Sequence, residues 1–336
     1  METFEFCADD LSGCLLEAAR RFSELYGYPR PEPAIYRRPR RPEASCIIVL
    51  HRNTHFVREL MIPSLVNAAV DRAIEIIVVC NAGGSFMRDE VECVVSESRS
   101  VARAYNLGIA RSRAPLVALF HDDCLLDDPA WLDKVSAAQR AGADAVSPEI
   151  RYLEKIGSTP IKPLPILKNV PLVAAREVFE SIGGYDERQL VGYEDLDFTL
   201  RLLESGRRTA RLGIGYRHFG GMSSCLKYLD YPNLDLLFAT LAAPAHTILE
   251  TFSSFCKKSD SRAATLLAAM NARQLGEVLA RHSRSIDAGT TALDILLGDL
   301  SCTAAAHAGI SAFELSSTPL SELDRRVVAL GRSERV

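Results

Sequence analysis

Two adjacent carboxylates follow an apolar stretch of the chain. Residues 116–120, LVALF, have the composition of a strand, and residues 121–123, HDD, end it. Open α/β sheets bind their ligands at the carboxyl ends of the strands. Carboxylate oxygens suit a hard divalent cation, which in turn accepts diphosphate oxygens, so this cluster predicts a metal–nucleotide site. The alternative is a solvent-exposed turn in which Asp127 or Asp128 caps a helix that starts near Pro129.

A second acidic group opens another predicted helix. Glu194, Asp195 and Asp197 lie in its first turn, and leucines at helical spacing form its apolar side. The helix dipole stabilises carboxylates there, which explains these residues without any catalysis; a carboxylate that removes a proton is the alternative. His218 follows a predicted strand at 209–212. It is either an ordinary loop histidine or a ligand for a divalent metal.

The elements that must position these residues alternate between strands and helices. Residues 46–50 are a continuous apolar run, residues 74–79 are apolar except for Glu75, and residues 55–70 between them have near-helical apolar spacing. Such a βαβ unit implies a parallel sheet that is buried on both faces. Further predicted helices and strands are helices at 100–112, 129–140 and 176–182 and strands at 143–146 and 170–174.

Segments without a clear α/β pattern lie between and outside these elements. Residues 151–169 contain three prolines and no clean period, which predicts a loop or lid. Residues 1–27 favour a short amphipathic helix, and the Pro- and Arg-rich residues 28–43 favour a solvated linker, although its arginines could meet an acidic partner or a phosphate. Beyond residue 225, helices rich in Ala and Leu are predicted at 234–252, 262–281, 290–307 and 320–330. These helices either pack on the main domain or serve acceptor binding or dimerisation.

Composition narrows the class of protein. A chain of 336 residues with 48% hydrophobic and 24% charged residues can form one large or two ordinary domains. The net charge of −4 gives no electrostatic reason to expect nucleic acid as a partner. The nine cysteines lack zinc-ligand spacing and are expected to be reduced thiols. No signal peptide and no run of about 18 apolar residues is found, so we expect a cytoplasmic protein without an integral membrane segment.

Seven motifs in order carry a resemblance to a known family. They are the strand 46–50, IEIIVV with CNAGG, SVARAYNLGIARS, LVALFHDDCLLDDPAWL, GGYDE, YEDLDFTLRLLESG and YRHFGG. In this order and spacing the chain resembles the family 2 glycosyltransferases, nucleotide-sugar enzymes of the GT-A fold. The resemblance covers residues 45 to about 222. It implies an α/β fold with a Rossmann-like, mostly parallel sheet flanked by helices, and the Ala- and Leu-rich helices predicted beyond residue 225 add a C-terminal helical extension. The expected division is 1–44, a catalytic domain at 45–224 and the extension at 225–336.

The resemblance also assigns candidate site residues. Asp122 would lie near the nucleotide ribose, and Asp123 would bind the metal, Mn²⁺ or Mg²⁺, with His218 as a further ligand. Asp195 would be the catalytic base, with Glu194 as the second choice. The remaining residues expected to bind the nucleotide-sugar are Leu50, Arg52, Cys80, Asn81, Arg103 and Asn106.

Two positions depart from the family pattern. Cys80 stands where an aspartate often reads the nucleotide base, which leaves the base open. His121 replaces the first aspartate of the carboxylate motif, and the two carboxylates that remain still suffice for a metal held mainly by phosphates and water.

The expected activity follows from these assignments. A sugar would pass from a nucleoside-diphosphate sugar to an acceptor hydroxyl with inversion, by metal-assisted single displacement. The acceptor would be a glycan, a lipid-linked or a small molecule, as in polysaccharide or glycoconjugate biosynthesis, and a homodimer could form through the C-terminal helices. The alternatives are a nucleotidyltransferase of related fold and a non-catalytic, glycosyltransferase-like scaffold.

Overall fold

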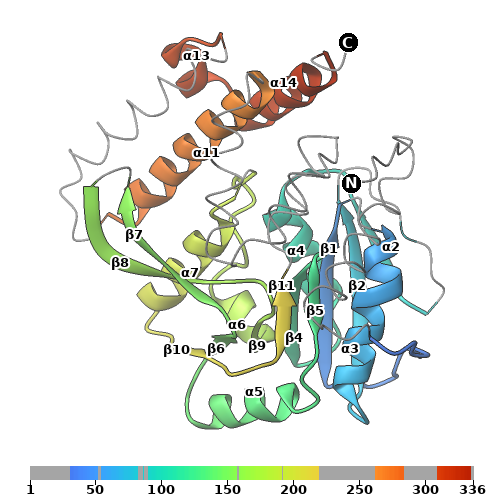
Figure 1. Ribbon diagram of the computed structural model, residues 1–336. Helices are drawn as coiled ribbons and strands as arrows, with labels where there is room; N and C mark the ends of the chain where they lie inside the picture. The colour runs from blue at the N-terminus through green and yellow to red at the C-terminus, as the bar shows by residue number, and fades with distance from the viewer. Residues whose placement is uncertain are drawn as a thin grey trace, which may run out of the picture.

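The computed structural model describes residues 31–51, 54–81, 86, 90–156, 159–190, 192–218, 262–283 and 309–333. Its centre is a seven-stranded sheet with the order β10-β6-β9-β4-β1-β2-β3 (Figure 1). These strands are β1 (Ala44–Leu50), β2 (Ile74–Asn81), β3 (Glu92–Ser96), β4 (Leu116–His121), β6 (Ala145–Ser147), β9 (Leu172–Ala175) and β10 (Thr209–Arg211). Only β9 runs antiparallel to its neighbours in this sheet. The predicted α/β fold with a mostly parallel sheet is therefore confirmed.

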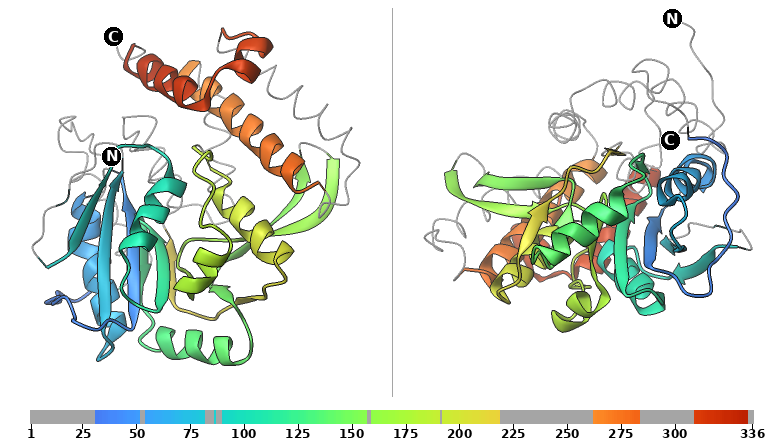
Figure 2. Two further views of the ribbon diagram at one scale, coloured as in Figure 1. Left: turned by 180° about the vertical axis from the view of Figure 1, so that it is seen from behind. Right: turned by 90° about the horizontal axis from the view of Figure 1, so that it is seen from below.

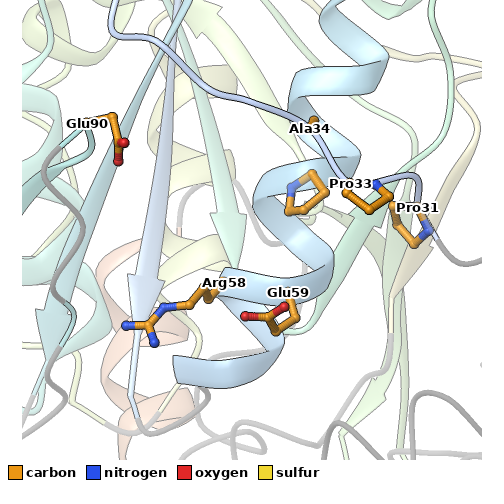
Figure 3. A pocket seen from close by; sticks show the side chains of 7 residues that line it. Pro31, Pro33, Ala34, Arg58, Glu59 and Glu90 are labelled. Atoms are coloured by element: carbon orange, nitrogen blue, oxygen red, sulfur yellow. The ribbon is translucent and has the colours of Figure 1, made fainter.

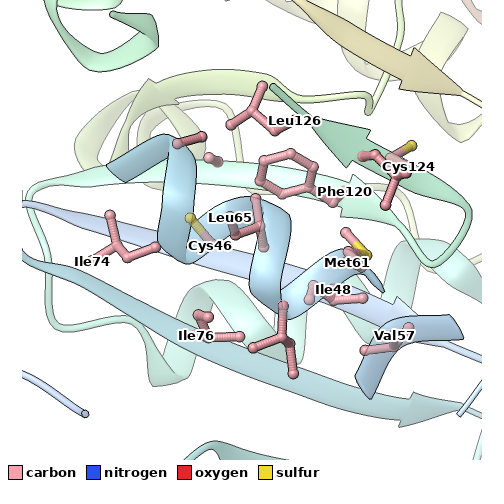
Figure 4. Packing of buried hydrophobic residues seen from close by; sticks show 14 of the residues in the cluster. Cys46, Ile48, Val57, Met61, Leu65, Ile74, Ile76, Phe120, Cys124 and Leu126 are labelled. Atoms are coloured by element: carbon pink, nitrogen blue, oxygen red, sulfur yellow. The ribbon is translucent and has the colours of Figure 1, made fainter. Parts of the chain in front are cut away.

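Helices cover both faces of the sheet. Successive residues of a strand point to opposite faces, and in this sheet the residues on both faces are apolar and need to be covered. Within β1, Cys46, Ile48 and Leu50 join one apolar cluster, and Ile47 and Val49 join another. The first cluster (Figure 4) includes residues of η2 (Val57–Met61), α3 (Ile62–Ala69) and α5 (Trp131–Arg140), with α2 (Thr54–Phe56) leading into η2. The second includes residues of α4 (Val101–Arg111), α6 (Arg176–Ser181) and α7 (Glu194–Glu204).

The helix α4 lies close against the centre of the sheet. It begins after Ser100, whose hydroxyl accepts a hydrogen bond from the backbone N–H of Arg103. A Cβ added at Gly108 would come within 2.4 Å of Cγ2 of Ile47. The glycine therefore permits the short distance between α4 and β1.

The segment predicted as a loop or lid at 151–169 is a β-hairpin, so that prediction was wrong. β7 (Ile150–Ile156) and β8 (Thr159–Leu167) pair antiparallel with an irregularity in the register near Leu153. The prolines do not prevent pairing because a strand in a two-stranded sheet has an open edge, where no donor is required. Figure 1 shows the hairpin beside α7. Leu164 of β8 packs in one apolar cluster with Leu196 and Leu200 of α7.

Three short strands went unpredicted. β3 is an edge strand, and Val95 within it is 75% exposed. β5 (Cys124–Leu126) and β11 (Tyr216–His218) form an antiparallel pair. β5 and β11 have three residues each, which is too few to show the alternation of apolar and polar residues that identifies a strand. His218 is consequently the last residue of a strand and not a loop residue.

The Pro- and Arg-rich segment packs on the sheet domain instead of standing free in solvent. As predicted, residues 31–43 form no helix, and no strand precedes β1 in the part of this segment that the structure describes. Tyr36 is only 4% exposed, and its hydroxyl accepts a hydrogen bond from the backbone N–H of Ile76 at 2.9 Å. Arg38 forms an ion pair with Glu92. The predicted helix at 1–27 lies outside the described residues.

The described C-terminal part is helical, as predicted. It contains α11 (Arg262–Arg281), α13 (Ala312–Ser317) and α14 (Leu320–Ser333), and α11 packs along α14 (Figures 1 and 2). The predicted helices at 234–252 and 290–307 lie outside the described residues. Among the helices that the structure describes, none combines the length and the apolar character needed to cross a bilayer.

Candidate functional site

The carboxylate pair lies at the carboxyl end of the central strand β4. Asp122 is fully buried and Asp123 is 2% exposed. Oδ2 of Asp122 accepts a hydrogen bond at 2.9 Å from the backbone N–H of His51, which directly follows β1. Because β1 and β4 are parallel neighbours, this bond joins their carboxyl ends. The predicted location at the ligand-binding edge of the sheet is therefore where the pair is found.

Asp123 lies beside His218. The pairing of β5 with β11 sets His218 opposite Cys124, and Nε2 of His218 is 3.4 Å from Oδ1 of Asp123. One donor atom from each of these three residues lies within 4.8 Å of the others. Burial raises the pKa of Cys124 well above its usual value, and a soft sulfur ligand suits Mn²⁺ or Mg²⁺ less than a carboxylate oxygen or an imidazole nitrogen does. The carboxylate oxygen and the imidazole nitrogen fit a divalent cation such as Mn²⁺ or Mg²⁺.

The opposite nitrogen of His218 faces Glu149, a residue that was not predicted from the sequence. Nδ1 of His218 is 3.7 Å from Oε2 of Glu149. Burial lowers the pKa of His218, but the carboxylates of Asp123 and Glu149 outweigh burial and raise it to about 9. Glu149 follows β6 directly after Pro148, so an acidic residue just beyond a predicted strand was the signal that could have identified it.

His121, the residue that departs from the family pattern, is a neutral aromatic neighbour of the metal-site candidates. Burial lowers its pKa to about 4. Its ring stacks on the ring of His218 with 5.7 Å between centroids, and its Nδ1 is 3.3 Å from the hydroxyl of Tyr105. His121 therefore adds no positive charge beside Asp123 at neutral pH.

The second acidic pair lies at the start of α7 and contacts a lysine that was not predicted. Glu194 and Asp195 are 7% and 6% exposed. Nζ of Lys168 forms an ion pair with Oδ2 of Asp195. Burial lowers the pKa of Lys168, but Asp195 and Glu194 outweigh burial and raise it, so the amine is charged. The hydroxyl of Thr199 donates to the carbonyl of Asp195 at 2.6 Å and accepts from the N–H of Leu167 at 3.0 Å, which ties α7 to β8.

The third carboxylate of this group, Asp197, contacts basic residues of α7 and of the C-terminal helical part instead of Lys168. It accepts a hydrogen bond from Nε of Arg201 at 2.8 Å, and its other oxygen is 3.2 Å from Nε2 of His282 at the end of α11. Arg281 also lies within ion-pair distance at 3.2 Å. Asp197 therefore links α7 to α11, whereas Glu194 and Asp195 remain the candidates for chemistry.

The base of the β7–β8 hairpin connects the two acidic groups. The N–H of Lys168 donates to the carbonyl of Glu149 at 3.1 Å, and the hydroxyl of Ser147 donates to the carbonyl of Lys168 at 2.8 Å. Glu149 faces His218, and Lys168 pairs with Asp195. The structure thus brings both groups into one site, although they are 72 residues apart when counted from Asp123 to Asp195 (195 − 123).

The candidates for nucleotide binding near β1 and β2 lie at the carboxyl ends of these strands. Leu50 and Cys80 are partners in the strand register, and both are buried. Burial raises the pKa of Cys80 to about 11, so this position carries no charge. The amide of Asn81 donates to the carbonyl of Arg99 at 3.2 Å, and its Oδ1 is buried with no hydrogen-bond partner in the described part of the chain. The last candidate of this group, Arg52, lies outside the described residues.

Asn106 and Arg103 lie on α4 beside the turn that follows α6. Asn106 donates to the carbonyl of Tyr185 at 2.9 Å and accepts from its N–H at 2.8 Å. A Cβ at Gly184, whose φ is +68°, would be 2.6 Å from Oδ1 of Asn106. The side chain of Arg103 is 52% exposed, and its Nε is 4.0 Å from Glu187. Asn106 therefore holds the turn, and Arg103 leaves its guanidinium near the surface.

A pocket of about 420 Å³ lies apart from these groups (Figure 3). It is formed between the segment before β1 and the helical segment after it, and its lining residues are Pro31, Pro33, Ala34, Arg58, Glu59, Pro63 and Glu90. None of the candidate site residues lines it.

No family model matches the sequence, and no curated protein matches it. Among solved structures, the mannosyltransferase PcManGT from Pyrobaculum calidifontis, in complex with GDP-Man and Mn²⁺, is 14% identical with a TM-score of 0.42, covering 98% of this chain and all of that one (100%). TarS 1-349 of S. aureus is 12% identical with a TM-score of 0.41, covering 87% and 92% of the two chains. GalNAc-T7 with UDP, GalNAc and Mn²⁺ is 11% identical with a TM-score of 0.42, covering 60% of this chain. This chain spans half (50%) of the length of that GalNAc-T7 structure.

Proposed function

We propose that the protein is a glycosyltransferase that moves a sugar from a nucleoside-diphosphate sugar to an acceptor hydroxyl with inversion. The observation that carries this proposal is that a candidate cation site and a buried acidic pair lie in one site. A buried carboxylate and an imidazole, Asp123 and His218, lie 3.4 Å apart, and the hairpin base joins them to the buried pair Glu194 and Asp195. One half suits a diphosphate with its cation, and the other suits a hydroxyl that must lose a proton.

Asp123 and His218 would hold the divalent cation, Mn²⁺ or Mg²⁺. Such an ion supplies Lewis-acid neutralisation of the negative charge on the leaving diphosphate. Asp122 would lie near the ribose, with Leu50, Arg52, Cys80, Asn81, Arg103 and Asn106 around the nucleotide-sugar. Cys80 is uncharged, so recognition of the base would rely on hydrogen bonds and packing, without a carboxylate at this position.

Asp195 would act as the base, with Glu194 as the second candidate. The acceptor oxygen attacks the anomeric carbon, the bond from that carbon to the diphosphate breaks, and the acceptor proton passes to the carboxylate. A carboxylate has about four lone-pair sites, so Asp195 can accept this proton while Lys168 and the N–H of Leu196 occupy others. A single displacement on the side opposite the leaving group inverts the anomeric centre.

We further propose that residues 45–224 form the catalytic domain and that 225–336 form a helical extension. Support comes from the contact between α11 and the turn before α7: Gln274 accepts a hydrogen bond from the N–H of Leu190 at 3.2 Å, and Leu275 packs with Leu196. The extension thereby contacts the segment that carries the proposed base.

The experiment is a titration of the full chain with UDP, GDP, CDP and dTDP, each with and without Mn²⁺. We expect at least one nucleotide to bind about tenfold or more tightly with Mn²⁺, which corresponds to roughly 1.4 kcal/mol. A panel in which every nucleotide binds equally with and without the metal would overturn the proposed metal-assisted transfer.

A further inference from the structure

Glu149 is the partly buried carboxylate at the end of a chain of polar contacts that starts at Asp123. His218 lies between the two carboxylates, with Nε2 at 3.4 Å from Asp123 and Nδ1 at 3.7 Å from Glu149. The side chain of Glu149 is 16% exposed. The two ring nitrogens of His218 therefore face different carboxylates, one on each side.

Glu149 is itself held in place. The hydroxyl of Tyr216 donates to its Oε2 at 3.0 Å, and Nε of Arg151 pairs with its Oε1. Its backbone is fixed as well, because its N–H donates to the hydroxyl of Ser147 at 3.2 Å and its carbonyl accepts from Lys168. This network uses both carboxylate oxygens and leaves the carboxylate little freedom to turn away from His218.

A neutral imidazole has one N–H and one lone pair, and a metal ligand must present the lone pair. The carboxylates of Asp123 and Glu149 keep His218 protonated when no cation is bound, so a cation would have to displace one of its two protons. If the hydrogen that stays is on Nδ1, it needs an acceptor, and Nε2 is then free to coordinate. In metalloproteins a carboxylate behind the histidine commonly fixes this tautomer and the orientation of the ring. Glu149 occupies that position relative to His218.

We infer that Glu149 is a positioning residue that orients His218 so that the lone pair of Nε2 is directed to the cation site beside Asp123. The inference rests on the metal use in the proposed function. The inference also gives the hairpin a role. At its base, Glu149 lies beside the proposed metal ligand His218, and Lys168 forms an ion pair with the proposed base Asp195.

The test is Mn²⁺ binding to the full chain in the presence of the nucleoside diphosphate that binds best in the panel above, with the free ion counted by electron paramagnetic resonance against a protein-free blank. We expect Glu149→Ala to weaken Mn²⁺ binding about 10- to 100-fold and Glu149→Gln, whose amide oxygen still presents an acceptor toward Nδ1, to weaken it less. Tyr216→Phe removes only the hydroxyl that holds Glu149 and should give a smaller loss. Glu43→Gln, a carboxylate paired with Arg72 at the surface, is the matched control and should bind like the wild type.

A double-mutant cycle separates positioning from direct coordination. If Glu149 acts through His218, Glu149→Ala causes no further loss in a His218→Ala background. The same fold-loss in both backgrounds, or wild-type affinity in Glu149→Ala, would overturn the inference and leave the proposed function standing. A wild-type chain that binds no Mn²⁺ would contradict the metal assignment itself, so the two failures are distinguishable.

Discussion

Lys168 and Asp195 form a buried ion pair at the centre of the base half of the site. The side chains are 19% and 7% exposed, and the lysine comes from the end of the hairpin, right after β8. A buried pair adds little net stability compared with apolar residues, but removal of one partner leaves the other charge without compensation. The pair therefore fixes where Asp195 lies relative to the hairpin.

Replacement of this lysine tests that role. We predict that Lys168→Met lowers the free energy of unfolding by about 3 to 5 kcal/mol, because Asp195 stays buried without its counter-charge. Urea denaturation of variant and wild type measures this difference. Lys168→Arg keeps the charge, so its free energy of unfolding should fall much less. Equal stability of Lys168→Met and the wild type would show that the ion pair does not compensate the charge of Asp195.

The two carboxylates after β4 have different partners, so their variants should behave differently. Asp123→Ala removes the oxygen 3.4 Å from His218 and should abolish metal-dependent nucleotide binding, because a lone imidazole holds a hard cation poorly. Asp122→Asn keeps an oxygen that can accept from His51 and should weaken binding less. Calorimetric titration with the nucleotide and Mn²⁺ measures both effects. If the nucleotide binds Asp123→Ala with unchanged Mn²⁺-dependent affinity, Asp123 is not a metal ligand.

At the scale of secondary-structure elements, the contact between α7 and α11 holds the acidic turn. His282 lies between Asp197 and Glu204 of α7, at 3.2 Å and 2.9 Å, and Arg281 and Arg201 also face Asp197. Burial lowers the pKa of His282, but hydrogen bonds to both carboxylates outweigh burial and raise it above 6.5. The histidine is therefore more easily protonated in the folded chain than in the unfolded one.

This difference gives the stability a defined dependence on pH. Because the folded pKa is raised, the stabilisation is fully present below the unfolded value of 6.5 and is lost as pH rises through the folded value. We predict that His282→Gln lowers the free energy of unfolding more at pH 6 than at pH 9, as measured by urea denaturation at both values. Comparison with the wild type at each pH cancels the contribution of other groups. A loss that is the same at both values, or larger at pH 9, would contradict this assignment.

At the scale of the whole molecule, the parts that the sequence predicted are those with strong local signals. β1, β2 and β4 are mostly apolar, since both faces of a parallel sheet are buried. The helix α11 was predicted with its observed bounds. The hairpin was missed because prolines in β8 resemble a loop, although its open edge tolerates them.

The residues that contact the predicted site residues were harder to predict from the sequence. Asp123 and Asp195 were identified because each follows or opens a clear element. Glu149 and Lys168 belong to the site because the hairpin base brings them to His218 and Asp195. The position of Glu149 just beyond a predicted strand was its one local signal, and no local pattern marks Lys168. The same holds for the link from Asp197 to His282.

The proposed sugar transfer requires the cation site of Asp123 and His218 and the proposed base Asp195 to act together. The most direct measurement is turnover of Asp195→Asn with the donor found by the nucleotide panel, together with its donor affinity. The amide keeps the shape but cannot take a proton, so turnover should fall by about 10²- to 10⁴-fold while donor affinity stays nearly unchanged. Glu194→Gln is the matched control and should lose less. Normal turnover in Asp195→Asn would contradict its role as base, and normal turnover in both variants would reduce the acidic pair to residues stabilised by the helix dipole.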